Sequence, residues 1–368
     1  MLNVLILGGT GAMGMHLISQ LKRKGYYITV TSRSNHESSE YVKYIKGNAM
    51  EEQFFNEVCN MKHWDAIVDF MVYSSEKLKQ RIEKFLDSTN QYIFISSARV
   101  YADSPDKAIT EKSDRLLDVC KDKEYLSTDE YALAKAREEN ILFNQNKKNW
   151  TIIRPSLTYG ENRIQLGVYE KENWLYRTLM GRSLVFSQDL LDKSYTLSYG
   201  KDVAKGIAAI VGEPKAIGEV FHIVADKSYK WKEILDLYVN ILEEYTGKKP
   251  KVVLTEKCTN IQIPGIKYQL IYGRYFNRNF DNSKINEFID TKDWLDAKDG
   301  LEICLKDFLN NPKFNKINWM IEAVIDRTVR ERTPLSEIKG KKNKLIYLCY
   351  RYRLGWLLQI VKKFKDKK

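Results

Sequence analysis

Histidine and cysteine are scarce in this 368-residue sequence, and neither occurs in a metal-binding pattern. The four histidines, His16, His36, His63 and His222, have no ligand spacing, so we expect no metal site. The five cysteines are odd in number and include no C-x-x-C pair, which is typical of reduced cytoplasmic thiols and argues against a disulfide framework. The first residues already resemble a buried strand, which leaves no room for a signal peptide and agrees with a cytoplasmic protein.

The sequence also lacks internal repeats and low-complexity linkers, and its 43% hydrophobic content is typical of a globular protein. Helical and extended patterns alternate along the first 155 residues. The predicted strands are 2–7, 27–32, 66–72, 92–96 and 150–154, and the predicted helices are 12–24, 51–61, 76–88 and 128–145. This alternation predicts an α/β fold with a doubly wound parallel sheet covered by helices on both faces.

A glycine-rich turn follows the first strand, where Gly8, Gly11 and Gly14 have the spacing G-x-x-G-x-x-G. A strand, a glycine turn and a helix N-terminus let backbone N–H groups approach a pyrophosphate, whose charge the helix dipole favours. The candidate cofactor contacts in this turn are Gly8, Thr10, Gly11, Ala12, Met13 and Gly14. The alternative is an ordinary glycine-rich turn between a strand and a helix.

A second motif, Tyr131-Ala132-Leu133-Ala134-Lys135, lies on a predicted helix about 120 residues later. Residues i and i+4 share one helical face, so the lysine ammonium can stabilise the phenolate of Tyr131 and make it a general acid/base. Upstream, residues 94–101 read as a buried strand that ends in the hydroxyls of Ser96 and Ser97.

The order and separation of these motifs resemble those of the extended short-chain dehydrogenases/reductases, in their nucleotide-sugar epimerase/dehydratase branch. The resemblance covers residues 2–310 and includes Arg154-Pro155 followed by Tyr159-Gly160, Asp202-Val203-Ala204, residues 218–223 and residues 281–284. It implies that Ser97, Tyr131 and Lys135 are catalytic, with Ser97 bound to the reacting sugar oxygen. It extends the cofactor site to Phe70, Met71, Tyr131, Lys135, Pro155 and Ser156.

The same resemblance implies a Rossmann-like NAD(P)-binding domain over 1–155 and a substrate lobe over 156–310, interleaved with the last elements of the sheet. Residues 311–368 would form a helical, basic C-terminal extension. The resemblance further implies a nucleotide-sugar substrate and leaves a homodimer open.

Departures from the family pattern bear on the cofactor and the reaction. Ser32 stands where NAD-preferring relatives place an acid, and Arg33 offers a guanidinium suited to a 2′-phosphate, so we favour NADP over NAD. Arg33 alternatively stacks on adenine or points to solvent, and Asn48-Ala49 stands where an aspartate commonly touches the adenine. Ala98-Arg99 replaces the acidic pair of the 4,6-dehydratases, which disfavours dehydration. Arg99 would bind a phosphate or an acidic sugar, or form a surface salt bridge.

The resulting hypothesis is a cytoplasmic enzyme that transfers a hydride to or from a nucleotide sugar. An epimerase in polysaccharide or glycoconjugate precursor synthesis is favoured over an NADPH-dependent nucleotide-4-ketosugar reductase. A catalytically silent or RNA-associated family member is the remaining alternative. Leu157 occupies a position where the family often has an asparagine for the nucleotide diphosphate, which argues against a standard UDP-hexose pose.

Positive charge is concentrated at the C-terminus, where residues 339–368 contain 11 Lys and Arg against the single acid Asp366. This stretch carries +10 of the net charge of +12. An apolar stripe at helical spacing runs through it: Leu345, Cys349, Tyr352, Trp356, Ile360 and Phe364. A basic amphipathic helix over 340–368 is typical of peripheral attachment to the inner face of a membrane or of partner docking. A terminal helix packed on its own domain is the alternative, and nucleic-acid binding is less expected. We expect deletion of 340–368 to leave catalysis largely intact.

Overall fold

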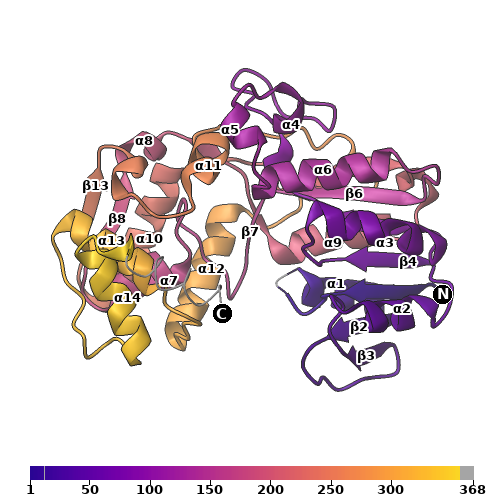
Figure 1. The fold of residues 1–368 in the computed structure, drawn as a ribbon, viewed down its shortest axis with the longest axis horizontal. Helices are drawn as coiled ribbons and strands as arrows, with labels where there is room; N and C mark the ends of the chain where they lie inside the picture. The colour runs from indigo at the N-terminus through magenta and orange to yellow at the C-terminus, as the bar shows by residue number, and fades with distance from the viewer. Residues whose placement is uncertain (12, 357–368) are drawn as a thin grey trace. The chain divides into compact units, whose positions relative to one another are not determined.

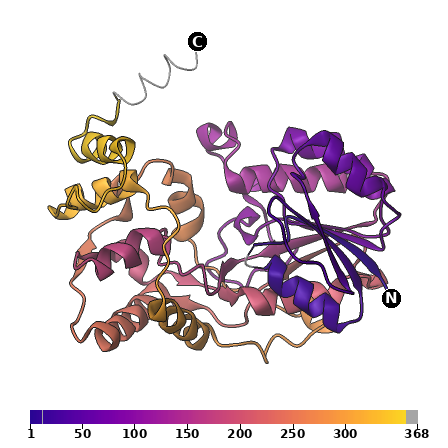
Figure 2. The same cartoon turned by 90° about the horizontal axis from the view of Figure 1, so that it is seen from below.

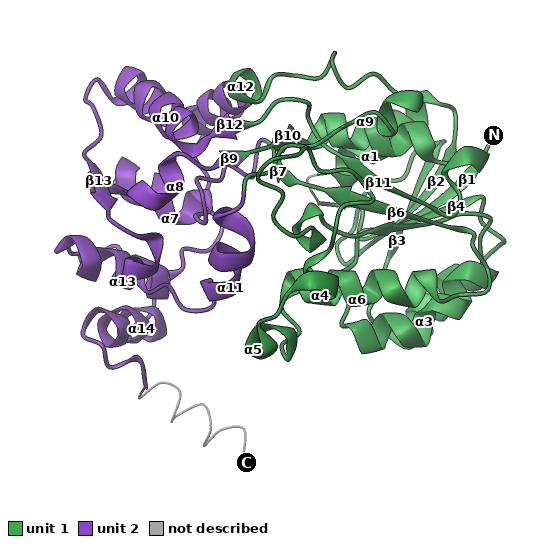
Figure 3. Cartoon of the chain, turned by 90° about the horizontal axis from the view of Figure 1, so that it is seen from above, with its two compact units in different colours: residues 1–160, 195–228, 277–300 green, residues 161–194, 229–276, 301–368 purple. Residues whose placement is uncertain are grey.

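The computed structural model describes residues 1–11 and 13–356, which fall into two units (Figure 3). Unit 1 comprises Met1–Gly160, Tyr195–Ser228 and Asn277–Gly300. Unit 2 comprises Glu161–Ser194, Tyr229–Phe276 and the chain from Leu301 onward. Helix α12, Ala297–Asn310, begins in unit 1 and ends in unit 2.

Unit 1 is built on a seven-stranded parallel sheet with the strand order β11-β6-β5-β4-β1-β2-β3 (Figure 1). The strands are β1 (Asn3–Leu7), β2 (Tyr27–Ser32), β3 (Val42–Lys46), β4 (Ala66–Asp69), β5 (Tyr92–Ile95), β6 (Trp150–Pro155) and β11 (Glu219–Ile223). Because all seven run in one direction, their carboxyl ends meet at one edge of the sheet. The chain turns to opposite sides of β1 as it forms β2 and β4, and this switch point is where such folds bind ligands.

Helices cover both faces of this sheet, as Figure 2 shows. On one face, α1 (Gly14–Arg23) and α9 (Gly200–Ile210) pack against Val4 and Ile6 of β1. On the other face, α2 (Glu52–Asn60), α3 (Ser75–Asp87) and α6 (Tyr131–Phe143) pack with Leu5 and Leu7. Four consecutive residues of β1 are therefore fully buried, since alternate side chains enter two different cores. The predicted α/β class and all nine predicted elements of residues 1–155 are present.

The units of the structure divide the chain in more places than the predicted domains do. Strand β3 was not predicted, and β11, within the lobe that was expected to be interleaved with the sheet, pairs in parallel with β6 as an edge strand of the main sheet. Residues 195–228 also return to unit 1 because β10 (Leu197–Tyr199) pairs with β7 (Leu157–Tyr159). The predicted lobe 156–310 is thus shared between the two units.

The remaining short elements of unit 1 are η1 (Ala98–Val100), α4 (Leu116–Val119), α5 (Lys123–Leu126), η2 (Pro214–Ala216) and η5 (Ile285–Glu287). Unit 2 has one parallel pair of strands, β8 (Leu184–Ser187) with β13 (Val252–Thr255). Its helices are α7 (Lys171–Leu179), α8 (Gln188–Leu191), α10 (Trp231–Thr246), η3 (Cys258–Ile261), α11 (Lys267–Gln269), the π-helix η4 (Leu270–Arg274), α13 (Trp319–Val329) and α14 (Lys341–Arg351). The two-residue strands β9 (Ser194–Tyr195) and β12 (Tyr229–Lys230) lie where the chain passes between units.

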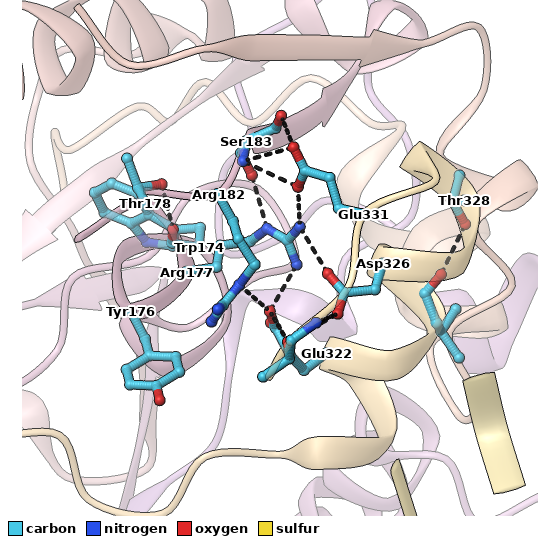
Figure 4. A network of polar contacts seen from close by, with 12 residues as sticks. Trp174, Tyr176, Arg177, Thr178, Arg182, Ser183, Glu322, Asp326, Thr328 and Glu331 are labelled. Atoms are coloured by element: carbon cyan, nitrogen blue, oxygen red, sulfur yellow. Dashed lines mark hydrogen bonds and ion pairs between the residues drawn. The ribbon is translucent and has the colours of Figure 1, made fainter. Parts of the chain in front are cut away.

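A buried ionic network fixes the C-terminal helices in unit 2 (Figure 4). The guanidinium of Arg177 on α7 donates to Glu322 at 2.9 Å and Asp326 at 3.1 Å on α13, and to Glu331 at 2.9 Å. Arg182 also donates to Glu322, at 3.1 Å. Residues 311–356 therefore belong to unit 2, and the helical extension predicted from residue 311 onward packs on this unit over the described residues.

Helix α14 packs on α13 through a face that differs from the predicted stripe. Tyr347 is fully buried, and its hydroxyl donates to Asp326 at 2.7 Å. Of the predicted stripe, Cys349 is buried, but Leu345, Tyr352 and Trp356 are 54–59% exposed. The stripe positions Ile360 and Phe364 lie outside the described residues. Removal of residues 340–368 would therefore remove part of the core of unit 2, contrary to the expectation from sequence.

Candidate active site

The turn after β1 has the tight geometry that the glycine spacing predicts. Gly8 has φ of +69°, a conformation that favours glycine. A Cβ on Gly14 would lie 2.4 Å from the carbonyl oxygen of Gly9, so the start of α1 packs directly on the turn. Met13 is the N-cap of α1 and makes no side-chain capping bond. The backbone N–H groups of the first turn are therefore not capped by its side chain. Ala12 lies outside the described residues.

This turn fits the pyrophosphate of a dinucleotide. A Cβ built on Gly11 would meet no atom within 4 Å among the described residues, so the backbone there is open to a ligand. The family's cofactor would supply a hydride acceptor or donor, and the turn and the start of α1 would hold its phosphates.

A pocket of about 460 Å³ opens beside the turn, at the ends of β1, β2 and β4. It brings together eight of the predicted cofactor residues: Gly8, Thr10, Ser32, Arg33, Asn48, Ala49, Phe70 and Met71. Thr31, Gly47, Met50 and Val72 also line it and were not predicted. Pro155 and Ser156 lie elsewhere: Pro155 is buried at the end of β6, and the Ser156 hydroxyl donates to the carbonyl of Thr196 at 3.0 Å.

A histidine that sequence reasoning did not assign to the site, His36, lies beside the end of β2. The Ser32 hydroxyl accepts from the backbone N–H of Ser34 at 3.2 Å and lies 3.1 Å from Nε2 of His36. The His36 ring stacks on Tyr44 of β3, with centroids 4.9 Å apart. Arg33 is exposed at the same corner of the pocket. Asn48 forms a local turn, accepting from the N–H of Met50 at 3.1 Å.

A buried carboxylate supports the wall of the pocket formed by Phe70 and Met71. Asp69, the last residue of β4, accepts from the N–H of Met71 at 2.9 Å and from the hydroxyl of Tyr92 at 2.9 Å. Burial raises the pKa of Asp69 to about 6, against the lowering effect of these hydrogen bonds. An aspartate after an apolar run was the only sequence signal for this residue.

The three predicted catalytic residues come from the segments around β5 and α6. Ser97 follows β5 and caps η1, where its hydroxyl accepts from the N–H of Arg99 at 3.2 Å. Tyr131 is the first residue of α6 and is 41% exposed, whereas Lys135, one turn later, is buried. The helix is thus formed as predicted, with the phenol at its accessible end.

Lys135 has a partner that the sequence did not suggest. Its ammonium lies 2.9 Å from the buried carboxylate of Glu138, at ion-pair distance but without hydrogen-bond geometry, and 4.5 Å from the ring centroid of Phe94. Burial raises the pKa of Glu138, while Lys135 acts to lower it. The side chains of Lys135 and Glu138 thus lie together on the buried face of α6.

The arginine of the Arg154-Pro155 motif has a structural role. Arg154 on β6 makes a bidentate pair with Glu139 of α6, at 2.8 and 2.7 Å. Glu139 also accepts from the Ser96 hydroxyl at 2.6 Å and from Arg115 at 3.1 Å. This buried cluster fixes α6 against the ends of β5 and β6 and so holds Tyr131 and Ser97 in place.

Arg99 forms an ion pair with Glu130, the residue before Tyr131, at 2.8 Å. The pair is not the surface salt bridge considered from sequence, because the two side chains are 13% and 17% exposed. Across residues 1–11 and 13–356, no group of three or more His, Cys, Asp and Glu side chains could hold a metal ion. No helix in the same residues is long and apolar enough to cross a membrane.

A parallel sheet with this strand order and a glycine turn at its switch point is an NAD-binding Rossmann fold. The model of the NAD dependent epimerase/dehydratase family matches residues 4–224, and the chain belongs to this family. Members of the family are NAD-dependent, as its description states.

Known proteins resemble the chain at low identity. It is 27% identical over 241 residues to chloroplast stem-loop binding protein of 41 kDa b from Arabidopsis thaliana, covering 61% of this chain and 59% of that protein. It is 22% identical over 270 residues to mitochondrial NADH dehydrogenase (ubiquinone) 1 alpha subcomplex subunit 9 from Dictyostelium discoideum, covering 66% and 64%. The chain thus spans less than two thirds of either relative.

Among solved structures, UDP-glucuronic acid 4-epimerase from Bacillus cereus in complex with UDP-glucuronic acid and NAD has a TM-score of 0.62 and 17% identity. The match covers 84% of this chain and 100% of that one. At this identity the likeness shows the fold.

Proposed function

We propose that this protein transfers a hydride between a nicotinamide cofactor and a carbinol or keto carbon of a nucleotide sugar, acting as an epimerase. The observation that carries the proposal is the joint placement of Ser97, Tyr131 and Lys135 on the segments that the Glu139–Arg154 pair holds together. An NADPH-dependent ketosugar reductase is the alternative, and the pathway in either case would be polysaccharide or glycoconjugate precursor synthesis.

Each residue has a distinct task in this reaction. The phenol of Tyr131 removes the proton from the sugar hydroxyl as the carbon is oxidised and returns it on reduction. The Ser97 hydroxyl donates to the same sugar oxygen and orients it. Lys135 stabilises the phenolate electrostatically, and Glu138 offsets part of that charge.

The cofactor that copurifies with the full chain separates the two reactions. An epimerase returns the hydride to the same sugar, so it retains its cofactor, and tightly held NAD(H) or NADP(H) in the isolated protein is the expected result. A protein that is isolated empty and is filled by added NADPH would be a reductase.

Arg33 sets the choice of cofactor in this proposal. Only NADP(H) carries a 2′-phosphate, and Arg33 and Ser32 line the pocket, with His36 beside Ser32. We expect Arg33→Ala to weaken NADPH binding by about 10-fold or more and NADH binding by less than about 2-fold. Calorimetric titration measures both, with Arg23→Ala, an exposed arginine at the end of α1, as the control. Equal losses for the two cofactors would rule out the contact.

We also propose that the surface around α14 docks on an anionic membrane. Leu345, Tyr352, Leu354 and Trp356 are exposed there, and residues 341–356 contain five Lys and Arg and no acid. Each basic residue near an anionic surface contributes about 1 kcal/mol, so Lys341→Glu with Lys342→Glu should sharply reduce cosedimentation with phosphatidylserine vesicles. The same change at Lys232 and Lys306, on α10 and α12, is the control. If the full chain ignores vesicles at low salt, the membrane proposal fails.

The stem-loop binding relative favours a rival, in which the chain binds RNA and has no catalytic turnover. The basic C-terminal residues are its other support. In this rival Tyr131 has no chemical role. The two proposals therefore differ in whether the Tyr131 hydroxyl transfers a proton.

A further inference from the structure

The guanidinium of Arg99 is buried with one of its edges unused. Its side chain is 13% exposed, and Nη1 lies 2.8 Å from Oε1 of Glu130. Within the described part of the chain, Nε and Nη2 are buried and have no hydrogen-bond partner. By contrast, Arg81, Arg154 and Arg177 each donate hydrogen bonds through Nε, Nη1 and Nη2.

Buried N–H donors without an acceptor lower the stability of a folded protein, and a ligand that accepts hydrogen bonds from them removes this free-energy cost. The Nε and Nη2 atoms form one planar edge, which matches the two oxygens of a carboxylate. Glu130 pairs with Nη1 and also accepts hydrogen bonds from the N–H of Ala132 at 2.9 Å and from the hydroxyl of Tyr125 at 3.1 Å. Its carboxylate is thus fixed and keeps the guanidinium in one orientation.

We infer that the free edge of Arg99 binds a carboxylate carried by the sugar of the substrate, so that the substrate is a nucleotide-linked acidic sugar. The inference rests on the proposed function. Arg99 follows Ser97 by two residues and donates its N–H to the Ser97 hydroxyl, and its partner Glu130 precedes Tyr131. Arg99 therefore belongs to the segment that carries Ser97, and its ion-pair partner is the neighbour of Tyr131, whereas neither residue belongs to the glycine turn assigned to the cofactor phosphates. A neutral sugar presents no group with two equivalent charged acceptors.

Calorimetric titration of the full chain, with saturating cofactor, tests whether Arg99 binds a sugar carboxylate. The ligands are UDP-glucuronate, UDP-glucose and UDP, and the corresponding dTDP compounds. UDP-glucuronate and UDP-glucose differ only in the carboxylate. We expect the wild-type protein to bind the acidic sugar at least about 10-fold more tightly than the neutral one, the gain of a charged bidentate contact. Arg99→Met should abolish this preference and change the affinity for UDP-glucose and UDP by less than about 2-fold.

Two further variants keep the result interpretable. Arg99→Lys retains the charge beside Glu130 but lacks the planar edge, so it should fold and show a reduced preference. Arg137→Met removes an arginine of α6 that donates to Thr128, Leu126 and Asp129, and it should leave the preference intact. If Arg99→Met does not fold, the comparison with Arg99→Lys decides the question.

Several results would overturn the inference. They are equal wild-type affinity for acidic and neutral sugars, no binding of any ligand, or an Arg99→Met loss shared equally by all ligands, UDP included. A shared loss would mean that Arg99 contacts the diphosphate or has only a structural role. Turnover of a neutral nucleotide sugar would leave the proposed function standing while this inference fails.

Discussion

Tyr131→Phe is expected to lower kcat by about 10²- to 10⁴-fold, the usual contribution of a general acid/base. The substitution removes only the hydroxyl at the accessible end of α6, so folding and cofactor affinity should be unchanged. Steady-state turnover, together with a calorimetric cofactor titration, measures both effects.

Tyr27→Phe is the matched control, since Tyr27 is a comparably exposed tyrosine at the start of β2. It should retain wild-type turnover. Near-normal activity of Tyr131→Phe would remove the tyrosine from the mechanism.

Tyr347→Ala is expected to destabilise unit 2 by about 3–5 kcal/mol, as for other buried aromatic side chains. The substitution empties a fully buried position between α13 and α14 and removes the hydrogen bond to Asp326, which also accepts from Thr333 and pairs with Arg177. Urea denaturation followed by fluorescence measures the loss.

Tyr352→Ala, five residues further along, tests whether this loss reflects burial. Tyr352 is 59% exposed, so its removal should cost less than about 0.5 kcal/mol. Chains that end at residue 339 should unfold like Tyr347→Ala or more readily, whereas chains that end at 356 keep the described core. Equal effects of the two tyrosines would contradict the packing of α14.

Local patterns were sufficient to predict every sheet strand of residues 1–155 except β3, because buried parallel strands and amphipathic helices have different periods. The glycine turn was equally clear, since Gly8 and Gly14 meet specific backbone requirements. The pairing of strand β11 with β6 could not be predicted, because it is a contact across about 70 residues of sequence and nothing within 218–223 indicates it. The division into units depends on such distant pairings.

The site was only partly predictable for the same reason. Ser97, Tyr131 and Lys135 belong to motifs, whereas Glu138, Asp69 and His36 matter through what lies beside them. A carboxylate three residues after Lys135 resembles any exposed helical acid until its burial is known. Similarly, the spacing of Leu345, Tyr352 and Trp356 indicates a shared helical face but not whether that face is covered.

The most direct test of hydride transfer is proton NMR of nucleotide sugars, acidic and neutral, incubated with the full chain and cofactor. An epimerase predicts a second sugar diastereomer that accumulates to equilibrium with wild-type protein and not with Tyr131→Phe. If no sugar is converted by cofactor-saturated wild-type protein, with NAD(H) or with NADPH, the central claim is contradicted and the stem-loop binding rival is favoured.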